Sequence, residues 1–80
     1  MKYIYKPKGV CTQQIELDIE NDVVTDVKFY GGCSGNTQGV AKLATGRKKV
    51  EIITLLEGIK CGFKQTSCPD QLAQALKEIE

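Results

Sequence analysis

The sequence has no histidine and no tryptophan, and only two prolines among its 80 residues. Because histidine is absent, the cysteine thiolates are the first candidates for ligands of zinc or of an iron–sulfur cluster. An excess of either charge is lacking as well, since eleven basic and ten acidic residues leave a net charge of +1. This balance gives no electrostatic argument for binding to nucleic acid or to a membrane surface.

Long apolar runs are also missing. The first nine residues, MKYIYKPKG, mix tyrosines with lysines, so we expect no secretory signal and no segment that spans a bilayer. We therefore expect the protein to be cytoplasmic, in a compartment where thiols stay reduced. Four cysteines are many for a chain of this length. In a reducing compartment such an excess indicates metal or thiol chemistry rather than disulfides.

Alternation of apolar and polar residues predicts three strands in an antiparallel meander, over residues 2–6, 14–20 and 23–30. In the second strand one face is shared by Ile15, Leu17 and Ile19. In the third strand the inner face is expected to hold Val23, Val27 and Phe29, with Thr25 between them. The sheet should therefore have one apolar face and one polar face.

Three helices are expected in the second half of the chain, over residues 37–45, about 49–57 and about 68–79. Glycines that can stop a helix follow the first two of them, at Gly46 and Gly58. Strands followed by helices predict a single α+β domain over residues 1–80. In this domain an N-terminal, three-stranded antiparallel sheet is covered on one face by three C-terminal helices.

The pentapeptide TSCPD, residues 66–70, puts a cysteine at the start of the last predicted helix. Ser67 is expected to be the N-cap, and Asp70 stands three residues later, in the position of a capping-box acid. Pro69 falls in the first turn, where its missing N–H costs nothing. Cys68 therefore lies where unpaired N–H groups and the helix dipole favour a thiolate, the form that binds metals or attacks electrophiles.

All four cysteines lie in or beside predicted loops: Cys11, Cys33, Cys61 and Cys68. A structural cysteine is usually a buried residue on a helix or strand face, so this placement favours a site. The spacing C-x21-C-x27-C-x6-C contains no C-x2-C pair and so differs from a zinc ribbon. If the loops converge at one end of the sheet, four thiolates suit Zn²⁺, at about 2.3 Å, or an iron–sulfur cluster. The alternative is a plain α+β domain with reduced, idle cysteines.

The sequence contexts of the four cysteines are KGVCT, GGCSGN, IKCG and TSCPDQLA. Together they resemble the TSCPD domain family, and the resemblance covers the whole chain. Members of this size are small stand-alone proteins, and related domains form a C-terminal part of adenosylcobalamin-dependent ribonucleotide reductases. The resemblance implies a link to deoxyribonucleotide synthesis, with ribonucleoside-diphosphate reductase as the associated activity.

A complete reductase needs a large barrel, a nucleotide site and a cobalamin site, and 80 residues are too few to build them. The chain also has no histidine to ligate cobalt. We therefore expect an accessory or binding module whose partner is a ribonucleotide reductase or another protein, with no oligomeric state set by the sequence. A thiol redox accessory would use Cys61 and Cys68, which are close enough in sequence to pair.

A second resemblance, from Phe29 onward, is to the U-type iron–sulfur cluster scaffold proteins. The shared order is a strand, GGC, a helix, GRKKVE, a helix, two cysteines and a C-terminal helix. This resemblance implies that a cluster is held by Cys11, Cys33 and Cys68, with Cys61 nearby. The sequence departs from that family where an aspartate and a histidine are usual, at Thr12 and Gln13 and at Ser67.

Overall fold

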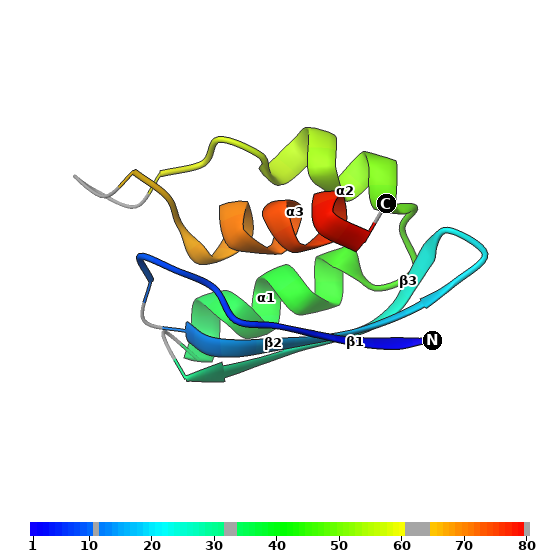
Figure 1. Ribbon diagram of the computed structural model, residues 1–80, viewed down its shortest axis with the longest axis horizontal. Helices are drawn as coiled ribbons and strands as arrows, with labels where there is room; N and C mark the ends of the chain where they lie inside the picture. Colours follow the sequence, from blue (N-terminus) through cyan, green and yellow to red (C-terminus); the bar gives the residue numbers. More distant parts are fainter. Residues whose placement is uncertain (11, 32–33, 61–64, 80) are drawn as a thin grey trace.

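The computed structural model describes residues 1–10, 12–31, 34–60 and 65–79. The strands come first along the chain and the helices follow (Figure 1). The strands are β1 (Lys2–Tyr5), β2 (Thr12–Glu20) and β3 (Val23–Gly31), and the helices are α1 (Ser34–Ala44), α2 (Lys49–Leu56) and α3 (Cys68–Ile79). The predicted α+β class and its order of elements are confirmed.

The sheet is antiparallel throughout, with the strand order β1-β2-β3. Tyr3, Leu17 and Val27 are register partners across the three strands. Leu17 and Val27 are buried and Tyr3 packs against them, because this row of side chains faces the helices. The next row toward the start of β2, from Tyr5 through Ile15 to Phe29, faces the same way.

A β-bulge changes which side chains of β3 face inward. Asp18 pairs with Asp26, whereas its neighbour Ile19 pairs with Val24, so Thr25 is an extra residue in β3. The Thr25 hydroxyl donates a hydrogen bond to the Asp18 carbonyl oxygen at 3.0 Å. Because the bulge shifts the alternation by one residue, Val24 is fully buried and Val23 is only half-buried. The expectation that Val23 belongs to the inner face was therefore wrong.

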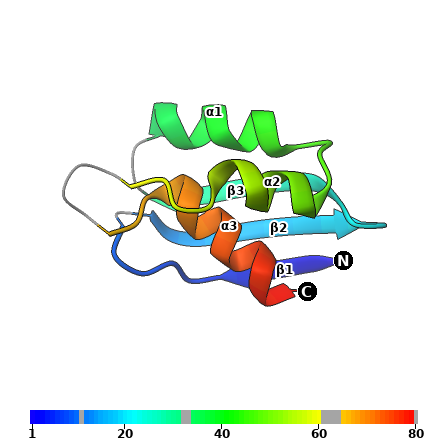
Figure 2. The ribbon, with the colours of Figure 1, turned by 90° about the horizontal axis from the view of Figure 1, so that it is seen from above.

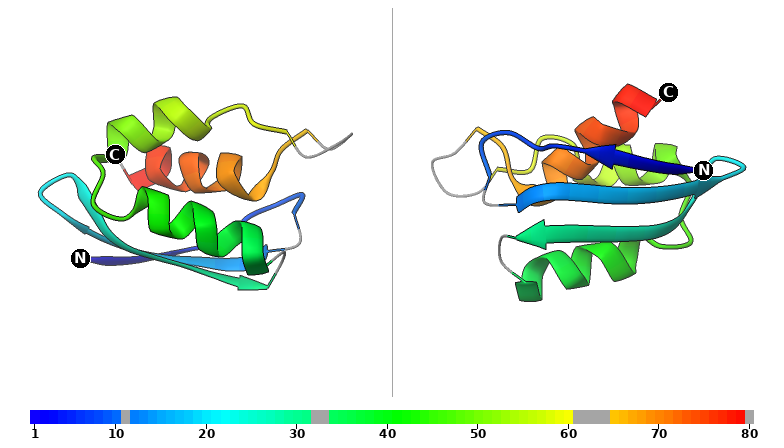
Figure 3. Two further views of the ribbon diagram at one scale, coloured as in Figure 1. Left: turned by 180° about the vertical axis from the view of Figure 1, so that it is seen from behind. Right: turned by 60° about the horizontal axis from the view of Figure 1, so that its bottom comes forward.

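Helices α1 and α3 lie on one face of the sheet, and α2 lies over α3 (Figure 1). Figures 2 and 3 show α1 running along β3 and α3 crossing over β1 and β2. Helix α2 packs on α3 and sends one buried side chain, Ile52, into the shared core. The start of α2 is fixed to the sheet by backbone hydrogen bonds from Val24 N to Arg47 O at 2.8 Å and from Lys49 N to Asp22 O at 2.9 Å.

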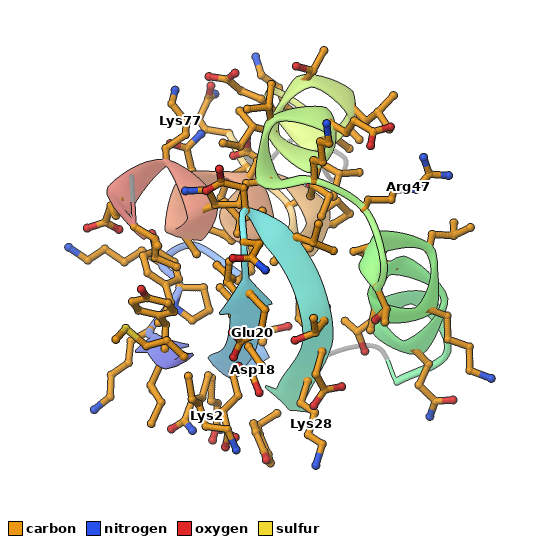
Figure 4. All side chains as sticks on the ribbon, turned by 90° about the vertical axis from the view of Figure 1, so that its right-hand side faces the viewer. Lys2, Asp18, Glu20, Lys28, Arg47 and Lys77 are labelled. Carbon is orange, nitrogen blue, oxygen red and sulfur yellow. The ribbon has the colours of Figure 1, made fainter. Side chains whose placement is uncertain are left out.

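The outer face of the sheet is polar, as the alternation predicts. Figure 4 shows Lys2, Asp18 and Lys28 pointing away from the helices. The Lys2 ammonium lies 3.9 Å from the Glu16 carboxylate on the neighbouring strand. Among the described residues, no helix is both long enough and apolar enough to cross a membrane.

Candidate functional site at the start of helix α3

The chain segments that flank the four cysteines lie at one end of the molecule. Thr12, the first residue of β2, is the register partner of Gly31, the last residue of β3. In Figure 1 this end of the sheet lies at the left, and α1 and α3 both begin on the same side. Cys68 is described by the structure, whereas Cys11, Cys33 and Cys61 lie outside the described residues.

Cys68 occupies the first turn of α3, as predicted, and carries a free, partly exposed thiol. Its Sγ lies 2.9 Å from the Oγ1 atom of Thr12, and either atom can be the hydrogen-bond donor. Thr12 itself is only 2% exposed. This contact joins the start of β2 to the start of α3, so the residue directly after Cys11 touches the sulfur of Cys68.

Ser67 is the N-cap of α3, which confirms the prediction. Its Oγ atom accepts a hydrogen bond from the backbone N–H of Asp70 at 3.1 Å. The same hydroxyl donates to the carbonyl oxygen of Ile59 at 2.7 Å. Ser67 therefore satisfies one of the unpaired N–H groups of the helix start and also ties the segment after α2 to that start.

Asp70 stands in the position predicted for a capping-box acid, and the partners of its carboxylate are residues before and within the helix. Its carboxylate accepts hydrogen bonds from the Gly58 N–H at 2.7 Å, from the Thr66 hydroxyl, and from the Gln74 amide at 3.3 Å. The residue is 7% exposed, so these donors replace most of its water. The carboxylate joins the segment that leaves α2 to the segment that enters α3.

The pKa of Asp70 reflects these hydrogen bonds. Burial acts to raise its pKa, but the hydrogen bonds from Thr66, Gly58 and Gln74, helped by the charge of Lys77, together outweigh burial. The pKa of Asp70 is therefore lowered from its ordinary value of 3.8. The charged form is thus the form that the folded chain stabilises.

Gln71 connects the start of α3 to the segment between β1 and β2. Its Oε1 atom accepts hydrogen bonds from the Lys8 N–H at 3.0 Å and from the Tyr5 hydroxyl at 3.4 Å. Its Nε2 atom donates to the Thr66 hydroxyl at 2.9 Å. Gly9 has a φ of +76°, and a Cβ placed on it would lie 3.1 Å from the Cγ2 atom of Thr66. Glycine is therefore needed at position 9, both for its backbone angle and for this close approach.

The result is a hydrogen-bonded frame at the start of α3, where Cys68 lies, which we call the α3 clamp. It comprises Thr66, Ser67, Asp70 and Gln71. Within the part of the chain that the structure describes, every buried polar side-chain atom has a hydrogen-bond partner. The described residues contain no group of three His, Cys, Asp or Glu side chains that could hold a metal ion. Cys68 is the only predicted ligand among the described residues.

Sequence reasoning missed Thr12 and Gln71 as parts of this site. Both are buried polar residues whose partners lie 56 and 63 residues away along the chain. Their sequence neighbours carry no local signal for such contacts. For Gln71 the one available hint is its position in the first turns of a helix whose other side chains are largely apolar or charged.

This arrangement defines a small α+β domain whose cysteine-flanking segments gather at the end where the last helix begins. The model of the TSCPD domain family matches residues 3–80, and the chain belongs to that family. It is thus a small domain related to the C-terminal domain of ribonucleotide reductase. No curated protein and no solved structure matches the chain.

Proposed function

We propose that this chain is a metal-binding accessory module in which Cys11, Cys33, Cys61 and Cys68 together hold one Zn²⁺ ion. An iron–sulfur cluster on the same thiolates is the alternative occupant. In this proposal the module serves a ribonucleotide reductase, or another protein of deoxyribonucleotide synthesis, and does not carry the reduction itself.

The observation that carries the proposal is the meeting of the cysteine-flanking segments at one end of the sheet. Thr12 and Gly31 are paired across β2 and β3, and Thr12 touches the sulfur of Cys68. This proximity supports a shared site for residues that are far apart in the sequence.

The donor set fits a soft metal ion. Four cysteines without a histidine match the tetrathiolate sites of zinc and of iron–sulfur clusters. The buried Thr12 hydroxyl beside Cys68 resembles the outer partners that orient metal ligands in proteins. The α3 clamp would hold the Cys68 sulfur in a fixed direction, since its hydrogen bonds fix both the helix start and the segments that lead to it.

A structural metal also suits the size of the domain. An 80-residue chain buries only a thin core, and small domains of this kind often need a metal or a disulfide to be stable. A tetrathiolate site would tie together the starts of β2, α1 and α3. The accessory role rests on the relationship of this family to a C-terminal domain of ribonucleotide reductase.

Single cysteine-to-serine variants test the proposed ligand set. Metal-free chains would be titrated with Co²⁺ under anaerobic conditions, with the sulfur-to-cobalt absorption as the readout and zinc competition for the affinity. Each of C11S, C33S, C61S and C68S is expected to weaken binding by more than the ~100-fold that losing an outer partner costs. Equal affinities in all four variants and the wild type would refute the ligand set.

The matched control is S67A, which removes a hydroxyl next to Cys68 but leaves all four thiols in place. It is expected to lower the free energy of unfolding by about 1 kcal/mol through the lost N-cap. Its cobalt spectrum should keep the shape and the stoichiometry of the wild type. A general loss of folding therefore cannot be mistaken for the loss of a ligand.

A further inference from the structure

An open apolar groove lies between α1 and α2, on the side of the molecule away from the sheet's outer face. Its volume is about 120 Å³. The buried residues Ala44 and Ile52 form its floor, whereas Leu43 and Leu55 stand at its edges with 69% and 59% of their surface exposed. Two large leucines that border an apolar groove in solvent are typical of a protein-contact surface.

Helix α2 exposes large apolar side chains on its outer side, beside the polar residues Glu51 and Thr54. Ile52 faces the core, and Ile53 and Leu56 are half-buried against it. Val50 and Leu55, which flank Glu51 and Thr54 on the outer side, are exposed at 63% and 59%. A surface helix normally keeps its outer side polar, so these two apolar side chains lack a cover in the single chain.

Gly39 is a second, independent sign of a contact on this side. It lies inside α1, one turn before Leu43, and therefore shares its face of the helix. A Cβ placed on Gly39 meets no atom within 4 Å, so packing within the chain does not require a glycine. Glycine weakens a helix relative to alanine, and its usual benefit is to let another backbone come close.

The charges at the groove are of both signs. Arg47 lines the groove, and its guanidinium lies 3.6 Å from the Glu51 carboxylate on α2. Its Nε also donates to the Leu43 carbonyl oxygen at 2.8 Å, which holds the side chain at the groove. Figure 4 shows Arg47 extending outward between the two helices. A face with one cation beside one anion is complementary to a second copy of itself.

We propose that this face, made of Gly39, Leu43, Arg47, Val50, Glu51 and Leu55, binds a second copy of the chain in a two-fold symmetric dimer. In the dimer Leu43 and Leu55 of each copy enter the groove of the other. Gly39 allows the α1 helices to approach closely, and each Arg47 faces Glu51 of the partner subunit. The dimer uses none of the four cysteines, so this inference is independent of the metal site.

Sedimentation velocity over a wide range of protein concentrations tests the proposal. The wild-type chain is expected to sediment as a dimer, and L43E and L55E as monomers with unchanged circular dichroism. Each of these changes should weaken association roughly tenfold or more, because it puts a charge into the apolar centre of the contact. The matched control is I4E, since Ile4 is 62% exposed on the outer face of the sheet, far from the groove. It should leave the dimer intact.

Charge reversal distinguishes this dimer from nonspecific apolar association. R47E and E51R should each weaken the dimer, because each puts two like charges together across the interface. The double variant R47E/E51R should restore it, since both the internal and the intersubunit pairs are then present with reversed signs. G39L should raise helix stability within the chain while it weakens the dimer. A wild-type chain that stays monomeric at every concentration, or a dimer that survives L43E but not I4E, would overturn the proposal.

Discussion

Replacing Asp70 with alanine is expected to lower the free energy of unfolding by about 3 kcal/mol, more than any other single change in the α3 clamp. The change leaves the Gly58 N–H and the Thr66 hydroxyl without the carboxylate that accepts their hydrogen bonds. These donors are part-buried, so water cannot fully replace the lost acceptor. Urea unfolding followed by circular dichroism measures the effect. The control D26A, at an exposed carboxylate of β3, should change the free energy by less than about 0.5 kcal/mol.

The pH dependence of this effect has a defined sign. Because the pKa of Asp70 is lowered in the folded chain, the charged carboxylate stabilises the fold above its ordinary pKa of 3.8. This stabilisation is lost as the pH falls from that value through the lower pKa of the folded state. The difference in stability between the wild type and D70N should therefore be full at neutral pH and shrink in acid. A difference that stays constant from neutral pH to below pH 3.8 would contradict the assigned role of Asp70.

Removing the metal is expected to have the largest effect of all, since under our proposal it unfolds the domain. Structural zinc sites contribute apparent binding free energies of about 10–16 kcal/mol. Small domains have a total stability of only about 5 kcal/mol or somewhat more. A strong chelator should therefore abolish the helical circular dichroism signal, and added zinc should restore it. The C68S variant should not respond further to the chelator. A metal-free chain that unfolds at the wild-type urea concentration would show that no metal stabilises the fold.

The order of strands and helices was predictable because the sequence carries its information in short, regular patterns. Ile15, Leu17 and Ile19 alternate without interruption, and the structure buries all three. The start of α3 was equally predictable, since Ser67 caps the helix as the local sequence indicates. Patterns of this kind depend only on neighbouring residues, so they can be recognised without knowledge of the tertiary structure.

The errors and omissions arose where distant residues decide the structure. A bulge at Thr25 turned Val24 inward in place of Val23, and no local signal in VVTDV indicates it. Asp70 looked like a simple capping acid, yet its carboxylate binds Gly58, twelve residues earlier in the chain. The contact between Thr12 and Cys68 spans 56 residues. Such contacts follow from how the sheet and helices pack, which sequence periodicity does not encode.

The most direct test of the metal-site proposal is the metal content of the wild-type chain, purified without air and without chelators. Zinc and iron would be measured per chain by mass spectrometry, together with the visible absorption spectrum. The proposal predicts one zinc per chain, no visible absorption and no free thiol that reacts rapidly. Iron with sulfide and a brown colour would instead support the cluster on the same cysteines. A stably folded chain with no metal and four reactive thiols would contradict the proposal and leave a redox role, or idle cysteines, for Cys68 and its three counterparts.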